Sequence, residues 1–108
     1  MQPVHSKKTI GILGGMGPAA TADFHRRISE ATDVRCDQDH LHVFIDCCPQ
    51  VPDRTAFLLG AGADPTPTLI AMARNLEKIG VEMLAMSCNT ADAFRAEVAA
   101  TVHIPLLP

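Results

Sequence analysis

The chain has 108 residues, of which 47% are hydrophobic and 19% are charged, and its formal net charge is −3. This length suits one small domain. The acidic balance and the scattered basic residues argue against a general nucleic-acid binder, which needs a basic face for the phosphates. A small anionic ligand stays open, because one buried arginine can bind a carboxylate whatever the overall charge.

The N-terminal segment and the cysteines indicate a cytoplasmic protein. Residues 1–8 are polar and show no signal-peptide pattern, and no apolar run approaches the roughly 20 residues of a transmembrane helix. We therefore expect no membrane partner and a compartment in which thiols stay reduced. Cys47 and Cys48 are adjacent while Cys36 and Cys88 stand apart, which is not a disulfide framework.

Short apolar runs predict four strands, at residues 9–13, 41–46, 82–86 and 104–107. Residues that recur at helical spacing between them predict three helices, at residues 18–32, 65–79 and 90–101. The side chains expected to face inward are Ala20, Phe24, Ile28 and Ala31 on the first helix, Leu69, Met72, Leu76 and Ile79 on the second, and Ala91, Phe94, Val98 and Val102 on the third.

Strands that alternate with helices predict an α/β fold, with a four-stranded parallel sheet, flanking helices and right-handed crossovers. Ligands of such sheets bind beyond the carboxyl ends of the strands. Three polar or glycine-rich turns fall at those ends, at residues 14–18, 46–54 and 87–90. We therefore expect these turns to converge on one site.

The first of these turns fits the pattern G-x-G-x-x-A, from Gly15 to Ala20. One interpretation is a dinucleotide site, and the other is a tight turn that brings backbone close to some other ligand. A dinucleotide site also needs an acidic residue about 20 positions further on, and Asp46 lies somewhat far along the chain for that role. Pro18 moreover lacks the N–H that a phosphate would use. A nucleotide-binding module that uses Gly15 and Gly17 is therefore kept as an alternative.

Cys88 falls where the third predicted strand ends and the third predicted helix begins. Free N–H groups at a helix start favour an anion, and they lower the pKa of a nearby thiol. The other interpretation is a small buried apolar side chain, which is the usual role of a free cysteine. Position alone leaves both interpretations open.

Four segments together resemble one enzyme family. They are I-G-I-L-G-G-M-G-P-A-A-T from Ile10 to Thr21, P-Q-V-P-D-R-T from Pro49 to Thr55, D-P-T-P from Asp64 to Pro67, and C-N-T-A from Cys88 to Ala91. In this order they are similar to the N-terminal half of the aspartate/glutamate racemases.

The resemblance implies a racemase that works without a cofactor by two-base proton transfer. One thiolate removes the α-proton from one face of the substrate, and a second thiol delivers a proton to the other face. Cys88 matches the first of these two cysteines. The chemistry suits thiols, because a thiol with a lowered pKa can act as acid or base near neutral pH.

The resemblance also implies substrate-binding residues. Asn89 and Thr90 would hold the α-carboxylate, and Arg54 would hold the side-chain carboxylate, for which a guanidinium fork is well shaped. The backbone near Met16 and the side chain of Gln50 would line the pocket.

Two positions depart from the family pattern. Ser87 stands where the family often has proline, and Asp92 stands where it often has histidine. The second catalytic cysteine belongs to a G-C-T motif in a second, similar half of the family's fold, and this chain has no such motif.

We therefore expect residues 1–108 to form the N-terminal, Rossmann-like half of a pseudo-symmetric two-domain racemase. We expect this half to be inactive alone. Its open side would leave apolar surface exposed, which favours self-association, including a homodimer. Cys36, Cys47 and Cys48 match no catalytic position.

His40 and His42 are two residues apart on a predicted strand and are expected to face the same side. With Cys36, Cys47 and Cys48 nearby, a metal site is conceivable. No recognised zinc-ligand spacing is present, and a solvated pair on the strand is the other interpretation. We expect no metal.

The leading hypothesis is an aspartate racemase that interconverts L- and D-aspartate, with aspartate or glutamate as the small-molecule partner. A broad-specificity amino-acid racemase of the same family is an alternative. The nucleotide-binding module and a non-catalytic fragment that only folds or pairs are the candidates from other classes.

Overall fold

The computed structural model describes residues 9–88 and 90–108. Its strands are β1 (Ile10–Gly14), β2 (Val43–Cys47) and β3 (Met83–Met86). Its helices are α1 (Pro18–Ala31), α2 (Arg54–Leu58), α3 (Thr66–Lys78) and α4 (Arg95–Ala99), together with the 3₁₀ helices η1 (Asp37–Asp39) and η2 (Thr90–Phe94).

The three strands form one parallel sheet in the order β2-β1-β3, which confirms the predicted α/β class. The prediction of a fourth strand at residues 104–107 is wrong, because the sheet has three strands. Residues 104–107 contribute only an isolated parallel bridge between Leu84 and Leu106, held by hydrogen bonds from Leu84 N to Pro105 O at 2.9 Å and from Leu107 N to Leu84 O at 2.8 Å. Pro105 has no N–H to donate, so the ladder cannot extend through it.

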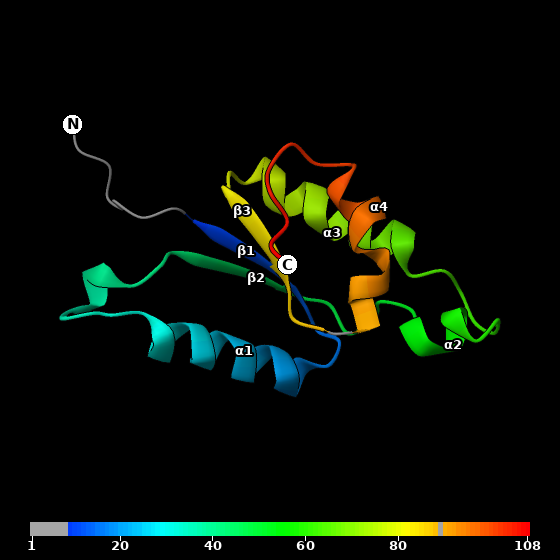
Figure 1. Cartoon of the computed structure of the whole chain (residues 1–108), viewed down its shortest axis with the longest axis horizontal. Coiled ribbons are helices and arrows are strands. Elements are labelled where there is room, and N and C mark those ends of the chain that lie inside the picture. The colour runs from blue at the N-terminus through cyan, green and yellow to red at the C-terminus, as the bar shows by residue number, and fades with distance from the viewer. Residues whose placement is uncertain (1–8, 89) are drawn as a thin grey trace.

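One face of the sheet carries most of the core. Leu13 and Leu84 on this face are fully buried, and α3 covers them with Leu69, Met72 and Leu76. In Figure 1, α3 and α4 lie together on this side and α1 lies on the other. All four predicted inward residues of the third helical segment are buried, namely Ala91, Phe94, Val98 and Val102. Ile79 was predicted inward but is 57% exposed, because it is the residue that caps the C-terminus of α3.

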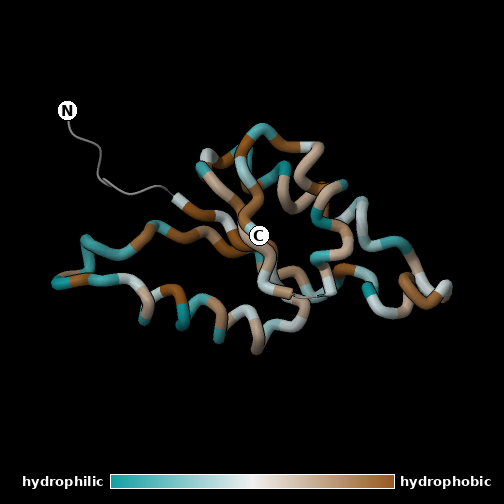
Figure 2. The backbone as a smooth tube through the Cα atoms, in the orientation of Figure 1, coloured by the Kyte–Doolittle hydropathy of each residue, from teal (hydrophilic) through white to brown (hydrophobic). Residues whose placement is uncertain are grey.

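The other face is covered less completely. On α1 the predicted inward residues Ala20 and Ala31 are exposed, and only Thr21 is fully buried. The reason lies on β1: Gly14 has no side chain, and the Thr21 side chain occupies the space that a Cβ there would fill. Ile45, which alternation places on this face, is 37% exposed. Hydrophobic residues concentrate along the strands in Figure 2, while polar residues dominate much of α1.

Two helical segments differ from the predictions. Residues 90–101 form η2 followed by the short α4 in place of one continuous helix. The predicted loop at 46–54 leads directly into α2, whose N-terminus is capped by the Asp53 side chain accepting a hydrogen bond from Ala56 N at 3.1 Å. A helix of five residues is too short to show periodicity in the sequence.

Within residues 9–88 and 90–108, none of the helices has both the length and the apolar character needed to cross a bilayer.

The burial of α3 predicts which substitutions in this helix lower the free energy of unfolding. Leu69 is fully buried, so Leu69→Ala should lower the free energy of unfolding by about 2–5 kcal/mol through lost apolar contact and the cavity left behind. Ile79→Ala, at an exposed position of the same segment, should change it by no more than about 0.5 kcal/mol. Urea titration followed by circular dichroism measures both, and equal effects would contradict the packing described.

Candidate active site

Cys88 lies at the carboxyl end of β3, the edge at which parallel sheets bind ligands. The backbone N–H of Ser87 donates to Leu13 O at 3.2 Å, which holds the chain beside β1 for one residue past the strand. The Cys88 side chain is half-buried, and its Sγ lies 3.0 Å from Thr90 Oγ1. The thiol is therefore held in place while part of it stays accessible.

Arg54 brings a guanidinium group to this thiol. It is the first residue of α2, and its Nη2 lies 4.0 Å from Cys88 Sγ. Its Nη1 donates to Val51 O at 3.5 Å and to Pro52 O at 3.3 Å, which fixes the plane of the group. Its Nε is buried and has no hydrogen-bond partner among the described residues. A buried N–H donor without a partner is costly, so this position favours an acceptor.

Opposing effects act on the ionisation of Cys88. Partial burial alone would raise the pKa of the thiol, since it disfavours the charged form. Hydrogen bonds from the Thr90 hydroxyl and from the backbone N–H groups of Ala91 and Thr90 stabilise the thiolate, and the positive charge of Arg54 adds a smaller contribution. The balance lowers the pKa of Cys88 below its ordinary value, which favours a reactive thiolate.

The glycine-rich turn after β1 makes its close contacts with other parts of the same chain. Gly15 N donates to Thr21 Oγ1 at 2.8 Å. A Cβ on Gly15, whose φ is +96°, would lie 2.3 Å from Cys48 N, so only glycine fits there. The Gly15 amide is thus engaged inside the protein and Pro18 has no N–H. The turn lacks these two donors for a pyrophosphate, which weakens the nucleotide-binding alternative.

The predicted site residues have different placements. The structure brings Cys88, Thr90 and Arg54 together. The side chain of Met16 is 6% exposed and packs in the core, so only its backbone is available to line a site. Gln50 is exposed, and its Oε1 accepts a hydrogen bond from Cys48 Sγ at 3.6 Å. Asn89 lies outside the described residues.

A cleft of about 350 Å³ opens beside Cys88, between α1, β3 and the C-terminal segment. Phe24, Asp92 and Arg95 line it together with Ala85, Met86, Cys88, Leu107 and Pro108. Arg95 donates from Nε to Leu107 O at 3.2 Å and from Nη2 to Leu106 O, which ties the C-terminal segment across the cleft. No sequence motif marks Arg95, because its partners are the backbone carbonyls of Leu106 and Leu107.

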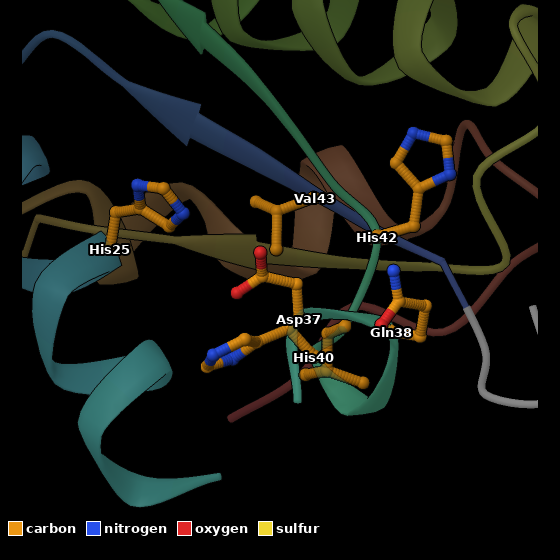
Figure 3. Close-up of a pocket in the computed structure, with 7 residues that line it drawn as sticks. His25, Asp37, Gln38, His40, His42 and Val43 are labelled. Atoms are coloured by element: carbon orange, nitrogen blue, oxygen red, sulfur yellow. The ribbon is translucent and has the colours of Figure 1, made fainter. Parts of the chain in front are cut away.

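A second cleft, of about 340 Å³, lies at the start of β2, at the end of the sheet opposite to Cys88. Figure 3 shows His25 of α1 near Asp37, while the imidazoles of His40 and His42 point in different directions. The prediction that His40 and His42 share one face of a strand is wrong. His40 caps η1, before β2 begins, and His42 stacks on Phe44 with ring centroids 4.5 Å apart. In the described part of the chain, no three His, Cys, Asp or Glu residues are grouped so as to hold a metal ion.

Comparison with known proteins identifies the family to which this chain belongs. The family described as Asp/Glu/hydantoin racemase matches residues 13–108. A broad-specificity amino-acid racemase, RacX of Bacillus subtilis (strain 168), is 32% identical over 105 residues, which are 91% of this chain and 44% of RacX. The chain therefore belongs to the Asp/Glu/hydantoin racemase family, as its motifs predicted.

Solved structures agree with this assignment. The aspartate racemase of Picrophilus torridus superposes with a TM-score of 0.85 at 33% identity, covering 94% of this chain and 43% of that one. An aspartate racemase homologue from Pyrococcus horikoshii OT3 has the same fold, with a TM-score of 0.73 at 23% identity and 94% and 44% coverage. The chain spans less than half the length of these relatives.

The contacts of Cys88 predict that its thiol reacts faster with an alkylating agent than the exposed thiols do. Iodoacetamide should alkylate Cys88 faster than the exposed Cys36 and Cys47, and the midpoint of the Cys88 rate against pH should lie below the ordinary pKa of a cysteine thiol. The sign follows from the lowered pKa, because a larger fraction is thiolate at any pH below the ordinary value. Thr90→Val should move the midpoint upward, since it removes the hydroxyl that stabilises the thiolate. Mass spectrometry of tryptic peptides measures each rate, and equal rates for all three thiols would contradict a tuned thiolate.

Proposed function

We propose that this chain is the N-terminal α/β domain, residues 1–108, of an aspartate racemase that inverts the α-carbon without pyridoxal phosphate or any other cofactor. The observation that carries the proposal is the pairing of Arg54 with Cys88. A guanidinium with a buried, unpaired Nε–H lies beside a thiol whose pKa is lowered. One group suits a carboxylate and the other suits an exchangeable proton, and an acidic amino acid carries both.

In the proposed reaction the Cys88 thiolate takes the α-proton, so the C–H bond breaks and an S–H bond forms. The electron pair stays on the α-carbon and is delocalised into the α-carboxylate, which needs hydrogen-bond donors around it to carry the added charge. Asn89 is a proposed donor to that carboxylate, and the Thr90 hydroxyl is proposed to become the second one after Cys88 Sγ has taken the proton and no longer needs the Thr90 hydrogen bond as a thiolate. A second thiol then gives its proton to the opposite face of the α-carbon.

The second thiol is proposed to come from outside this chain. Cys36 and Cys47 are exposed, and Cys48 Sγ donates to Gln50 Oε1 rather than taking part in the contacts around Cys88. A second domain agrees with the chain's share of its relatives, 44% of RacX and 43% of the Picrophilus enzyme. We also propose a cytoplasmic location, since a thiol base must stay reduced to act.

Arg54 is proposed to set the preference for acidic substrates. With Nη1 on two backbone carbonyls and Nε buried, Nη2, which faces Cys88 Sγ, is the donor left for a side-chain carboxylate. The similarity to a broad-specificity racemase favours a second candidate function, an enzyme of the same chemistry with a wider substrate range. The two candidates differ in how far activity depends on this guanidinium.

The chain by itself should exchange the α-proton of aspartate with solvent but should not invert the α-carbon. With one thiol placed for acid–base work, it should return each proton to the face from which it came. We expect purified 1–108 in deuterated water to incorporate α-deuterium into L-aspartate slowly and to form no D-aspartate. Cys88→Ala should abolish the exchange and Cys36→Ala should leave it unchanged. Proton NMR and chiral chromatography measure the two quantities. D-aspartate formation at an enzymatic rate would overturn the single-thiol assignment.

Substrate preference is tested on Arg54 in the two-domain protein. Arg54→Lys keeps the positive charge but loses the planar fork, so kcat/KM for aspartate should fall by about 10-fold or more while that for alanine changes little. Thr55→Ala, at the adjacent exposed position of α2, is the matched control. An equal loss for both substrates would make Arg54 a structural residue, and no loss for either would favour the broad-specificity enzyme.

A further inference from the structure

The hydroxyl of Thr21 joins the two turns that meet at the carboxyl edge of the sheet. Thr21 is 3% exposed, and its Oγ1 lies 2.8 Å from Gly15 N, 3.1 Å from Gly17 O and 3.1 Å from Ser87 Oγ. Gly15 and Gly17 belong to the turn after β1, and Ser87 precedes Cys88. One buried oxygen therefore contacts both the glycine-rich turn and the segment that carries the thiol.

A donor and acceptor count shows how these contacts coexist. A threonine hydroxyl has one proton to donate and two lone pairs to accept with. It accepts from Gly15 N, donates to Gly17 O, and uses its second lone pair for the Ser87 hydroxyl. If its proton instead points to Ser87 Oγ, the Ser87 hydroxyl can donate to Leu13 O at 3.4 Å. Both arrangements keep the link between the two turns.

The local sequence permits this junction. A Cβ on Gly14 would lie 2.5 Å from Thr21 Cγ2 and 2.8 Å from Thr21 Oγ1, so a side chain there would displace the threonine. Ser87 supplies a hydroxyl at a position where proline would offer neither the hydroxyl nor the N–H that donates to Leu13 O. The junction therefore depends on the residue types of this chain at Gly14, Thr21 and Ser87.

We propose that Thr21 is a positioning residue, whose hydroxyl fixes the Ser87–Cys88 segment against the glycine-rich turn and so holds the Cys88 sulfur in reach of Thr90 and Arg54. It touches neither substrate nor the reacting atoms. The inference rests on the proposed function only for its catalytic consequence. Its structural part, a hydroxyl that controls the reactivity of a thiol one turn away, stands without it.

The test compares three variants of the purified protein. Thr21→Val removes the hydroxyl and keeps the branched shape, and Thr21→Ser keeps the hydroxyl. Ser87→Ala removes the Ser87 hydroxyl, with its contacts to Thr21 and Leu13 O, and leaves the bonds from Thr21 to Gly15 and Gly17 in place. Thr32→Val is the control, because Thr32 caps the far end of α1 and its hydroxyl donates to Ile28 O at 2.7 Å. Two readouts follow: the pH midpoint of Cys88 alkylation, and the hydrogen-exchange protection of the Gly15 amide.

Thr21→Val should expose the Gly15 amide to exchange and raise the alkylation midpoint by about half a pH unit, which is roughly a threefold loss of thiolate at neutral pH. Ser87→Ala should raise the midpoint while leaving the Gly15 amide protected. Thr21→Ser and Thr32→Val should match the wild type in both. An unchanged midpoint in Ser87→Ala, or in a folded Thr21→Val, overturns the proposal, because the bond from Ser87 N to Leu13 O would then suffice to place Cys88.

The racemase readout separates the two proposals. In the two-domain protein, Thr21→Val should lower kcat for aspartate with little change in KM, and Thr21→Ser should restore it. Absence of racemase activity in the wild type would overturn the proposed function alone. The alkylation and exchange results would still decide the role of Thr21.

Discussion

The site depends on one steric constraint, the absence of side chains on two successive residues at the end of the central strand. Gly14 leaves room for Thr21 of α1, and Gly15 leaves room for the backbone of Cys48 as β2 ends. A methyl group at either position would push an element away from β1. These two close approaches bring α1 and the end of β2 against the edge at which β3 delivers Cys88, and they do so at the middle strand, which pairs with both neighbours.

The thiol of Cys88 is tuned mainly by short hydrogen bonds, and the nearby charge contributes less. Thr90 and the backbone N–H groups of Thr90 and Ala91 outweigh the opposing effect of partial burial, while the guanidinium of Arg54 is a smaller contributor. Two unit charges 4 Å apart interact by about 1 kcal/mol in water and by about 4 kcal/mol at an effective dielectric of 20. Cover over the site would therefore strengthen the Arg54–Cys88 pair more than it would strengthen bonds that are already short and local.

The two faces of the sheet differ in how completely other elements cover them. The face under α3 and α4 is a continuous core that includes Leu13, Leu69 and Leu84. On the α1 face, Ile45 stays partly exposed. The C-terminal segment lies at the edge of the sheet beside β3, where Leu106 pairs with Leu84 and Arg95 donates to its carbonyl oxygens. The cleft beside Cys88 lies on this second, less tightly packed face, where the side chains of Phe24 and Ala85 help to line it.

Much of the fold was predictable because it follows from local pattern. Apolar runs located β1, β2 and β3, and helical spacing located α1 and α3 to within two residues at each end. The C-N-T-A and P-D-R-T segments indicated Cys88, Thr90 and Arg54, which the fold brings together although 34 residues separate Arg54 from Cys88. The alternation of strands and helices explains this, since it sends the ends of parallel strands to one edge.

The tertiary structure decided what local pattern could not. A proline in the last apolar run reduced a predicted strand to a single bridge, since ladder pairing depends on which N–H groups face a partner. Thr21, a polar residue beside the apolar stripe of α1, is the buried one because it packs directly onto Gly14, which has no side chain. Its hydroxyl joins residues 66 positions apart, and Arg54 Nε is buried without a partner in the completed fold. Such contacts depend on which groups meet across elements, and the sequence determines them only by way of the completed fold.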